Sequence, residues 1–121
     1  MKIIEAISGI DELKRNTYSQ LRKVQWLSEL DATVQAECVD THDGGGTFQG
    51  YGGDTDLQTV LLIPAPYDNA YLLWLEAKID YYNGEMDKYN NAMAMFYAAY
   101  DGFKNHYNRT HMPKGQKIKY F

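Results

Sequence analysis

Cysteine is nearly missing from this chain, since Cys38 is the one thiol among 121 residues. A single thiol excludes an internal disulfide and a four-thiolate zinc site within one chain. The longest run without a charged residue covers twelve residues, 89–100, against the ~20 that a membrane-spanning helix needs. Glu5 interrupts the first apolar stretch, so we expect no secretory signal, no membrane contact and synthesis in a cytoplasm.

Basic residues are missing from a long central stretch. Residues 24–77 contain nine Asp or Glu and no Lys or Arg. Residues 1–101 hold 16 acids and seven bases, a net of −9, whereas residues 102–121 hold five bases and no acid. The net charge of −4 argues against a general nucleic-acid binder, because such proteins neutralise phosphates with Lys and Arg. The basic end of the chain is suited to an acidic partner instead.

Signatures of catalysis are also missing. The chain has no Gly-x-Ser-x-Gly motif, and its glycine clusters at residues 44–46 and 50–53 are not followed by the Lys-Ser/Thr of a phosphate-binding loop. Cys38 lies on an apolar helical stripe, where cysteine usually behaves as a small hydrophobe. We therefore expect a protein that is not an enzyme and that has no cofactor.

The glycine-rich stretch carries the residues of a candidate metal site. Oxygen ligands from acidic loops suit calcium or magnesium, and the candidates are Asp40, His42, Asp43, Asp54 and Asp56. The twelve-residue calcium-loop pattern with its terminal Glu is missing. The sequence thus favours a solvated acidic loop with no metal, and a small regulatory or metal-binding protein is the alternative from a different functional class.

What is present predicts a mainly α fold, a small bundle of about four helices. Apolar periodicity of 3–4 residues places the helices at residues 3–14, 19–39, 66–83 and 85–108. Residues 1–113 are expected to form a single helical domain, and residues 114–121 an extended C-terminal tail. Within the domain, residues 40–63 form a glycine-rich loop or a short β-hairpin insertion, with candidate strands at 47–49 and 59–63.

The two last helices are predicted to pack as a central antiparallel hairpin. The turn Asn83-Gly84 leaves no room for another arrangement, and Gly84 suits a left-handed cap. Helix 66–83 is apolar around most of its circumference, apart from a polar stripe that includes Asp80, so more than one neighbour must cover it. Phe96 is central in the apolar stripe of helix 85–108. Asp31 projects into the apolar stripe of helix 19–39, where we expect a rim position or a bond to a backbone amide.

Several longer motifs resemble small proteins encoded among the head and tail genes of tailed bacteriophages of Firmicutes and gut bacteria. The motifs are Asp11-Glu12-Leu13-Lys14, Trp26-Leu27-Ser28-Glu29-Leu30-Asp31, Leu61-Leu62-Ile63-Pro64-Ala65-Pro66-Tyr67-Asp68, Leu75-Glu76-Ala77-Lys78-Ile79-Asp80 and Tyr89-Asn90-Asn91-Ala92-Met93. More distantly, the chain is similar to the head–tail connector, or adaptor, family. The glycine-rich insertion at residues 40–57 departs from the simplest connectors.

The resemblance implies a structural virion protein of the phage neck. Connector subunits form homo-oligomeric rings, commonly of twelve, beneath the portal protein, and they extend the DNA channel toward the tail. The implied partners are further copies of the chain, the portal, the next neck or tail protein, and passing DNA without sequence-specific binding. Another neck or tail-completion protein is the alternative within the same assembly.

Two sets of residues are predicted to serve that role. The partner-binding set combines basic residues with the alternating anchors of an extended strand, and it comprises Arg109, Lys114, Lys117, Ile118, Lys119, Tyr120 and Phe121. The second set consists of acids expected to face the channel, where like charge keeps DNA from sticking, and it comprises Asp40, Asp43, Asp54 and Asp56.

Overall fold

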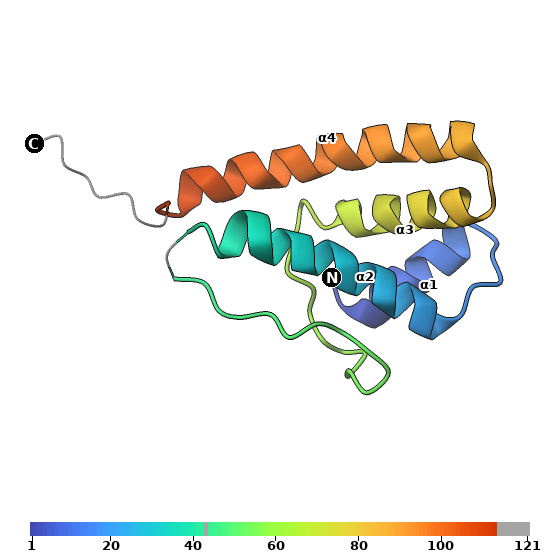
Figure 1. The fold of residues 1–121 in the computed structure, drawn as a ribbon, viewed down its shortest axis with the longest axis horizontal. Coiled ribbons are helices and arrows are strands. Elements are labelled where there is room, and N and C mark those ends of the chain that lie inside the picture. Colours follow the sequence, from blue (N-terminus) through green and yellow to red (C-terminus); the bar gives the residue numbers. More distant parts are fainter. Residues whose placement is uncertain (43, 114–121) are drawn as a thin grey trace, which may run out of the picture.

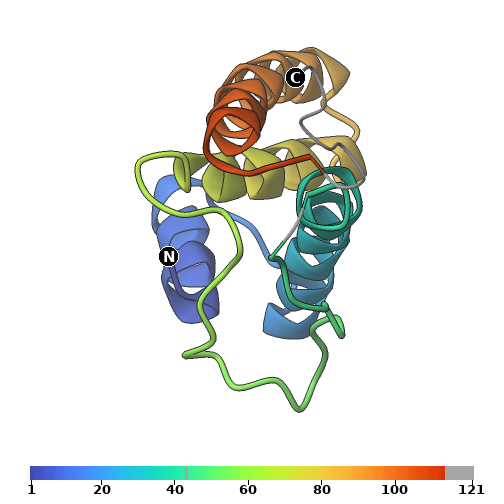
Figure 2. The ribbon, with the colours of Figure 1, turned by 90° about the vertical axis from the view of Figure 1, so that its left-hand side faces the viewer.

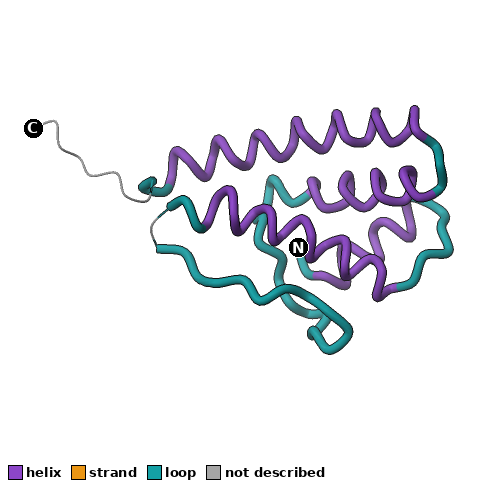
Figure 3. Tube along the Cα trace, viewed as in Figure 1, coloured by secondary structure: helices purple, strands orange, loops and turns teal. Residues whose placement is uncertain are grey.

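A computed structural model describes residues 1–42 and 44–113, and these residues form a small helical bundle (Figure 1). The helices are α1 (Ile3–Leu13), α2 (Gln20–Val34), the π-helix η1 (Gln35–Val39), α3 (Asn69–Tyr82) and α4 (Met86–Thr110). No strand occurs in this described part of the chain (Figure 3). The prediction of a mainly α bundle with about four helices is therefore confirmed.

Helix α3 lies at the centre and contacts α1, α2 and α4 (Figure 2). This position explains its composition, because a helix with neighbours on several sides must be apolar around most of its circumference. Its fully buried side chains include Tyr71, Leu75 and Ile79. In contrast, α4 packs on α3 and on η1 and has no close backbone contact with α1 or α2 in the described chain.

The connection between α3 and α4 is a tight turn at residues 83–85. Gly84 has φ +80°, a left-handed conformation that glycine adopts without steric cost, and its N–H donates to the carbonyl of Tyr81 at 3.1 Å. The two helices lie side by side and run in opposite directions (Figure 1). Phe96 is buried against Trp74, with ring centroids 5.2 Å apart.

The helix boundaries differ from those predicted by up to three residues, apart from the larger change at the end of α2. The expected helix 19–39 ends as an α-helix at Val34 and continues as η1, a change that periodicity cannot detect because Val34 and Cys38 remain buried. Ser19 caps α2 by accepting from the N–H of Arg22 at 3.1 Å, so α2 begins at Gln20, one residue later than predicted. Helix α3 begins three residues later than predicted, because residues 64–68 form turns first.

The predicted strands at 47–49 and 59–63 are wrong, and the insertion is a long loop. A strand needs a partner along its length, but only Val60 forms a bridge here, with Lys2. The loop is tied to the chain start by single bonds, such as the N–H of Leu61 to the carbonyl of Met1 at 2.8 Å. The loop alternative of the prediction therefore describes residues 44–63.

Asp80 is a further correction, because it was placed on the polar stripe of its helix. Its side chain is fully buried, and its Oδ1 lies 2.6 Å from the Nζ of Lys14. No hydrogen bond of good geometry reaches either oxygen in the described chain. A buried carboxylate needs a countercharge, and here α1 supplies it at the point where α1 meets α3.

Candidate functional site

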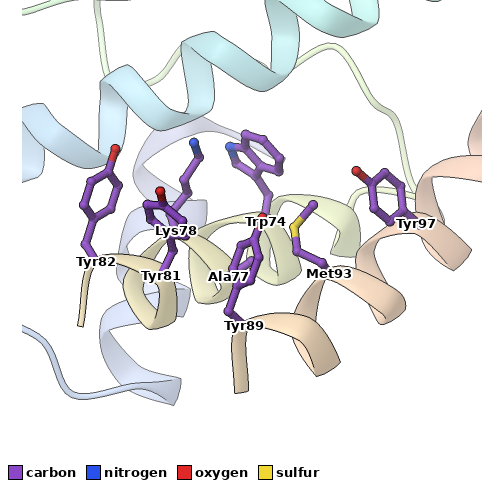
Figure 4. A pocket seen from close by; sticks show the side chains of 8 residues that line it. All are labelled: Trp74, Ala77, Lys78, Tyr81, Tyr82, Tyr89, Met93 and Tyr97. Atoms are coloured by element: carbon purple, nitrogen blue, oxygen red, sulfur yellow. The ribbon is translucent and has the colours of Figure 1, made fainter. Parts of the chain in front are cut away.

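A groove lined largely by aromatic side chains runs between α3 and α4, and α2 and η1 border its narrower part. Helix α3 forms the floor of this groove. Because α3 lies between α2 and α4, these two helices share no close backbone contact. The wider part has a volume of about 440 Å³. Figure 4 shows its lining, which consists of Trp74, Ala77, Lys78, Tyr81, Tyr82, Tyr89, Met93 and Tyr97. We call the whole depression the aromatic groove.

The aromatic groove continues toward η1 as a narrower part of about 280 Å³. Trp74 and Tyr97 line both parts and make them continuous. The remaining lining residues of the narrower part are Leu30, Thr33, Glu37, Phe96, Tyr100, Asp101 and Lys104. One end is therefore aromatic, and the other combines aromatic side chains with two carboxylates and one ammonium group.

Tyrosines of the groove are unusually exposed. Tyr97, Tyr82 and Tyr81 have exposed fractions of 55%, 52% and 49%. Tyrosine gives a large apolar contact and keeps a hydroxyl for a partner, which is why it is enriched at protein interfaces. The arrangement suits recognition of another chain rather than burial within this one.

The walls of the groove are fixed by contacts to α2. The Nε1 of Trp74 donates to the carbonyl oxygen of Trp26 at 2.8 Å, and Tyr82 stacks on Trp26 with ring centroids 5.6 Å apart. The Nζ of Lys78 lies 2.8 Å from a carboxylate oxygen of Glu29 and 4.8 Å from the ring centre of Trp74. These contacts fix the positions of Trp74, Lys78 and Tyr82.

The narrow end is organised around Glu37. Tyr100 donates its hydroxyl to Oε1 of Glu37 at 2.7 Å, and the Nζ of Lys104 lies 3.8 Å from the same oxygen. Burial, with the hydrogen bond to Glu37 as a further cause, raises the pKa of Tyr100. Tyr100 therefore stays a protonated donor. Glu37 and Asp101 remain partly exposed acids at the rim.

Cys38 lies behind this end and is buried as predicted. Burial raises the pKa of its thiol, which disfavours the thiolate that nucleophilic chemistry requires. Its side chain thus contributes packing beside Tyr100. The predicted role of a small hydrophobe is confirmed by this burial.

A buried cluster of hydrogen bonds around Asp31 holds the loop of residues 44–63 against the helices. Asp31 is fully buried, and its carboxylate accepts from the hydroxyls of Tyr51 at 2.5 Å and Tyr71 at 2.6 Å and from the N–H of Leu62 at 3.1 Å. The hydroxyl of Tyr71 also accepts from the N–H of Ile63 at 2.6 Å. The predicted bond to a backbone amide is present, but Asp31 is a core residue and the rim alternative is wrong.

Three of the predicted channel acids, Asp40, Asp54 and Asp56, are exposed. Asp40 caps η1, where the side-chain nitrogen of Gln35 donates to it at 2.8 Å. Asp54 and Asp56 lie in the loop turn near residue 55, and Asp56 accepts from the N–H of Gln58 at 2.9 Å. Asp43 is outside the described residues. Within residues 1–42 and 44–113, no three His, Cys, Asp or Glu side chains are placed to hold a metal ion.

The predicted partner-binding set falls mostly outside the structure as described. Arg109 is exposed in the last turn of α4. The other six members, Lys114, Lys117, Ile118, Lys119, Tyr120 and Phe121, lie outside the described residues. The chain is followed as far as Pro113, which forms an isolated bridge with His42 at the end of the bundle where η1 and α4 terminate.

The sequence analysis did not single out the groove residues. Two features of the sequence indicated them. Aromatic and apolar residues occupy more of the surface of α3 than its neighbours cover, and residues 89–100 carry no charge even on their outward side.

None of the described helices has the length and apolarity required to cross a membrane. Comparisons of the chain with models of protein families, with curated proteins and with solved structures give no match.

Proposed function

We propose that this protein is a head–tail connector subunit of a tailed bacteriophage. In this proposal, copies of the chain assemble into a ring beneath the portal, extend the DNA channel toward the tail and remain in the virion neck. The motifs quoted above support the family, and the open aromatic groove supports an assembly role. The subunit acts by contact with its neighbours and performs no reaction.

The observation that carries the proposal is the exposure of aromatic side chains in the groove. Tyr81, Tyr82 and Tyr97 are about half exposed although they adjoin Trp74, which packs against the core. Contiguous apolar patches of this kind mark interaction sites on soluble proteins. A ring subunit needs two such surfaces, because each copy contacts a neighbour on either side.

The acids of the loop support the second element of the proposal, a channel that does not retain DNA. Asp40, Asp54 and Asp56 are exposed, and their charge acts within a Debye length of about 8–10 Å. We propose that some of these side chains line the bore of the ring. A ring carrying Asp54→Asn and Asp56→Asn is expected to retain duplex DNA at low salt, whereas the wild-type ring releases it.

The deciding experiment is a mass measurement on the purified protein, alone and mixed with the portal complex. The proposal expects a ring of many copies bound to the portal. Tyr97→Ser is expected to weaken that assembly, and Leu13→Ser is the matched control because Leu13 is an exposed apolar residue outside the groove. A wild-type chain that stays monomeric and ignores the portal would contradict the proposal. Assembly with a tail protein in place of the portal would assign the chain to another part of the neck.

A further inference from the structure

The described chain ends beside one end of the aromatic groove, and its remaining residues match the groove in chemistry. Residues 114–121 contain three Lys and no acid, together with Ile118, Tyr120 and Phe121. The narrow end of the groove presents two acids, Glu37 and Asp101, against one base, Lys104, which is a net charge of −1 next to aromatic rings. Basic residues therefore meet carboxylates, and apolar anchors meet an apolar floor.

We propose that the aromatic groove is the receptor for residues 114–121 of a second copy of this chain. This inference rests on the proposed assembly function and names the contact that joins neighbouring subunits. In an extended segment, Ile118 and Tyr120 point to the same side about 6–7 Å apart. That side faces Trp74 and Tyr97 of the groove, and Lys117 and Lys119, which lie on the opposite side of such a segment, face the acidic rim.

The position of Pro113, where the described chain stops, favours a segment from a second copy, and not the chain's own segment, as the occupant of the groove. Helix α4 carries the chain past η1 to the end of the bundle, away from the wide part of the groove (Figure 1). The bridge between His42 and Pro113 holds it there. Entry into its own groove requires a reversal directly after Pro113, whereas a neighbour placed head to tail receives the segment without one. A head-to-tail contact of this kind closes into a ring when its rotation permits.

A peptide experiment tests recognition separately from assembly. The probe is a fluorescent peptide with the sequence of residues 114–121, and the receptor is the full-length chain carrying Ile118→Ser and Tyr120→Ser, so that its own segment does not compete. We expect saturable binding that weakens as salt increases. Adding Tyr97→Ser to the receptor should weaken binding about tenfold or more, whereas adding Leu13→Ser should leave it unchanged. Equal binding with and without Tyr97→Ser would overturn the inference.

A mixing experiment tests whether the contact joins two copies. The chain with Ile118→Ser and Tyr120→Ser keeps a working groove, and the chain with Tyr97→Ser keeps a working segment. Each alone should be monomeric, and an equal mixture should form heterodimers that grow no further, because only one productive contact is available per pair. A mixture that stays monomeric although the peptide binds would show that the segment occupies its own groove, which overturns the inference.

The two proposals fail in different ways. If the wild-type chain forms a ring with the portal but neither the peptide nor the mixture responds to Tyr97→Ser, the connector function stands and the inference is wrong. If the peptide binds the groove and the mixture forms heterodimers but the wild-type chain ignores the portal, the connector function is wrong and the contact between copies stands.

Discussion

Buried Asp31 is the residue on which the position of the loop depends. Its carboxylate joins α2 to the loop through Tyr51 and Leu62 and to α3 through Tyr71. The sequence predicts that such a carboxylate needs a donor, and one of its donors is the expected backbone amide. It does not predict the two hydroxyls, because Tyr51 and Tyr71 are 20 and 40 residues away along the chain.

Tyr71→Phe is expected to lower the free energy of unfolding by about 1–3 kcal/mol, since it leaves a buried acceptor and a buried donor without a partner. Asp31 loses one of three bonds, and the N–H of Ile63 loses its acceptor. Denaturant unfolding measures the change. Tyr97→Phe is the control, because the side chain of Tyr97 is exposed, and it should leave stability within about 0.5 kcal/mol of wild type.

Asp31 also predicts a pH dependence. Burial raises the pKa of Asp31 above its ordinary value, although the bonds from Tyr51, Tyr71 and Leu62 oppose the change. The native state therefore takes up this proton at a higher pH than the unfolded chain does, so lowering the pH stabilises the native state at this position. The difference in unfolding free energy between wild type and Asp31→Asn should grow in favour of wild type from about pH 7 to about pH 4. A difference that shrinks over this range would contradict the sign of the shift.

Phe96 is the residue-scale test of the core. Phe96→Ala is expected to cost about 3–5 kcal/mol, because the ring is buried and leaves a cavity next to Trp74 and Tyr100. The neighbouring Met95 is 60% exposed, so Met95→Ala should cost less than about 1 kcal/mol. Thermal unfolding of both variants tests this, and equal losses would mean that the face of α4 is assigned wrongly.

At the scale of elements, the apolar pattern predicts where helices exist better than where they change type. Helix α1 ends within one residue of its prediction, because Ile3, Ile7 and Ile10 mark its buried face directly. The change from α2 to η1 leaves the buried face intact, so no pattern reports it. The burial of Asp80 was missed because its partner Lys14 directly follows a different helix, α1, and periodicity describes one helix at a time.

The groove was missed for a related reason. Sequence patterns mark apolar residues, but they do not tell which neighbour leaves a side chain uncovered. Tyr97 and Tyr100 are three residues apart on α4, yet Tyr97 is exposed and Tyr100 is buried against η1. Only the spacing of α2, α3 and α4 in three dimensions separates these two roles.

Gly84 is the element-scale test of the turn between α3 and α4. Gly84→Ala is expected to cost about 1–2 kcal/mol, because an L-residue is strained in the left-handed region, and the φ of Gly84 is +80°. A Cβ would meet no atom within 4 Å, so the cost is one of backbone conformation alone. Gly46→Ala is the control, since it has the same free space and no positive φ. Equal stability of the two variants in denaturant would contradict the left-handed turn.

For the whole molecule, removal of residues 114–121 separates stability from assembly. Among residues 1–42 and 44–113, the buried apolar core spans residues 3–103, so we expect the shortened chain to unfold at nearly the same temperature as the full chain. Its association with other copies or with the portal should weaken, and the association of the full chain should weaken as salt increases. Calorimetry and mass measurement provide the two readouts. Undiminished assembly of the shortened chain at all salt concentrations would exclude the segment as a docking element.

Helix α4 packs on the rest of the bundle through one side, and this affects its local stability. Helices α1, α2 and α3 contact one another, whereas in the described chain α3 and η1 are the helices that α4 contacts, with added ring contacts to His42 and Tyr67. Elements with few neighbours open locally at a lower free energy than the rest of the domain. A partner that fills the groove adds contacts to the free side of α4 and stabilises the closed form in proportion to the logarithm of its concentration. In the proposed assembly, a neighbouring copy would therefore supply part of the rigidity of α4.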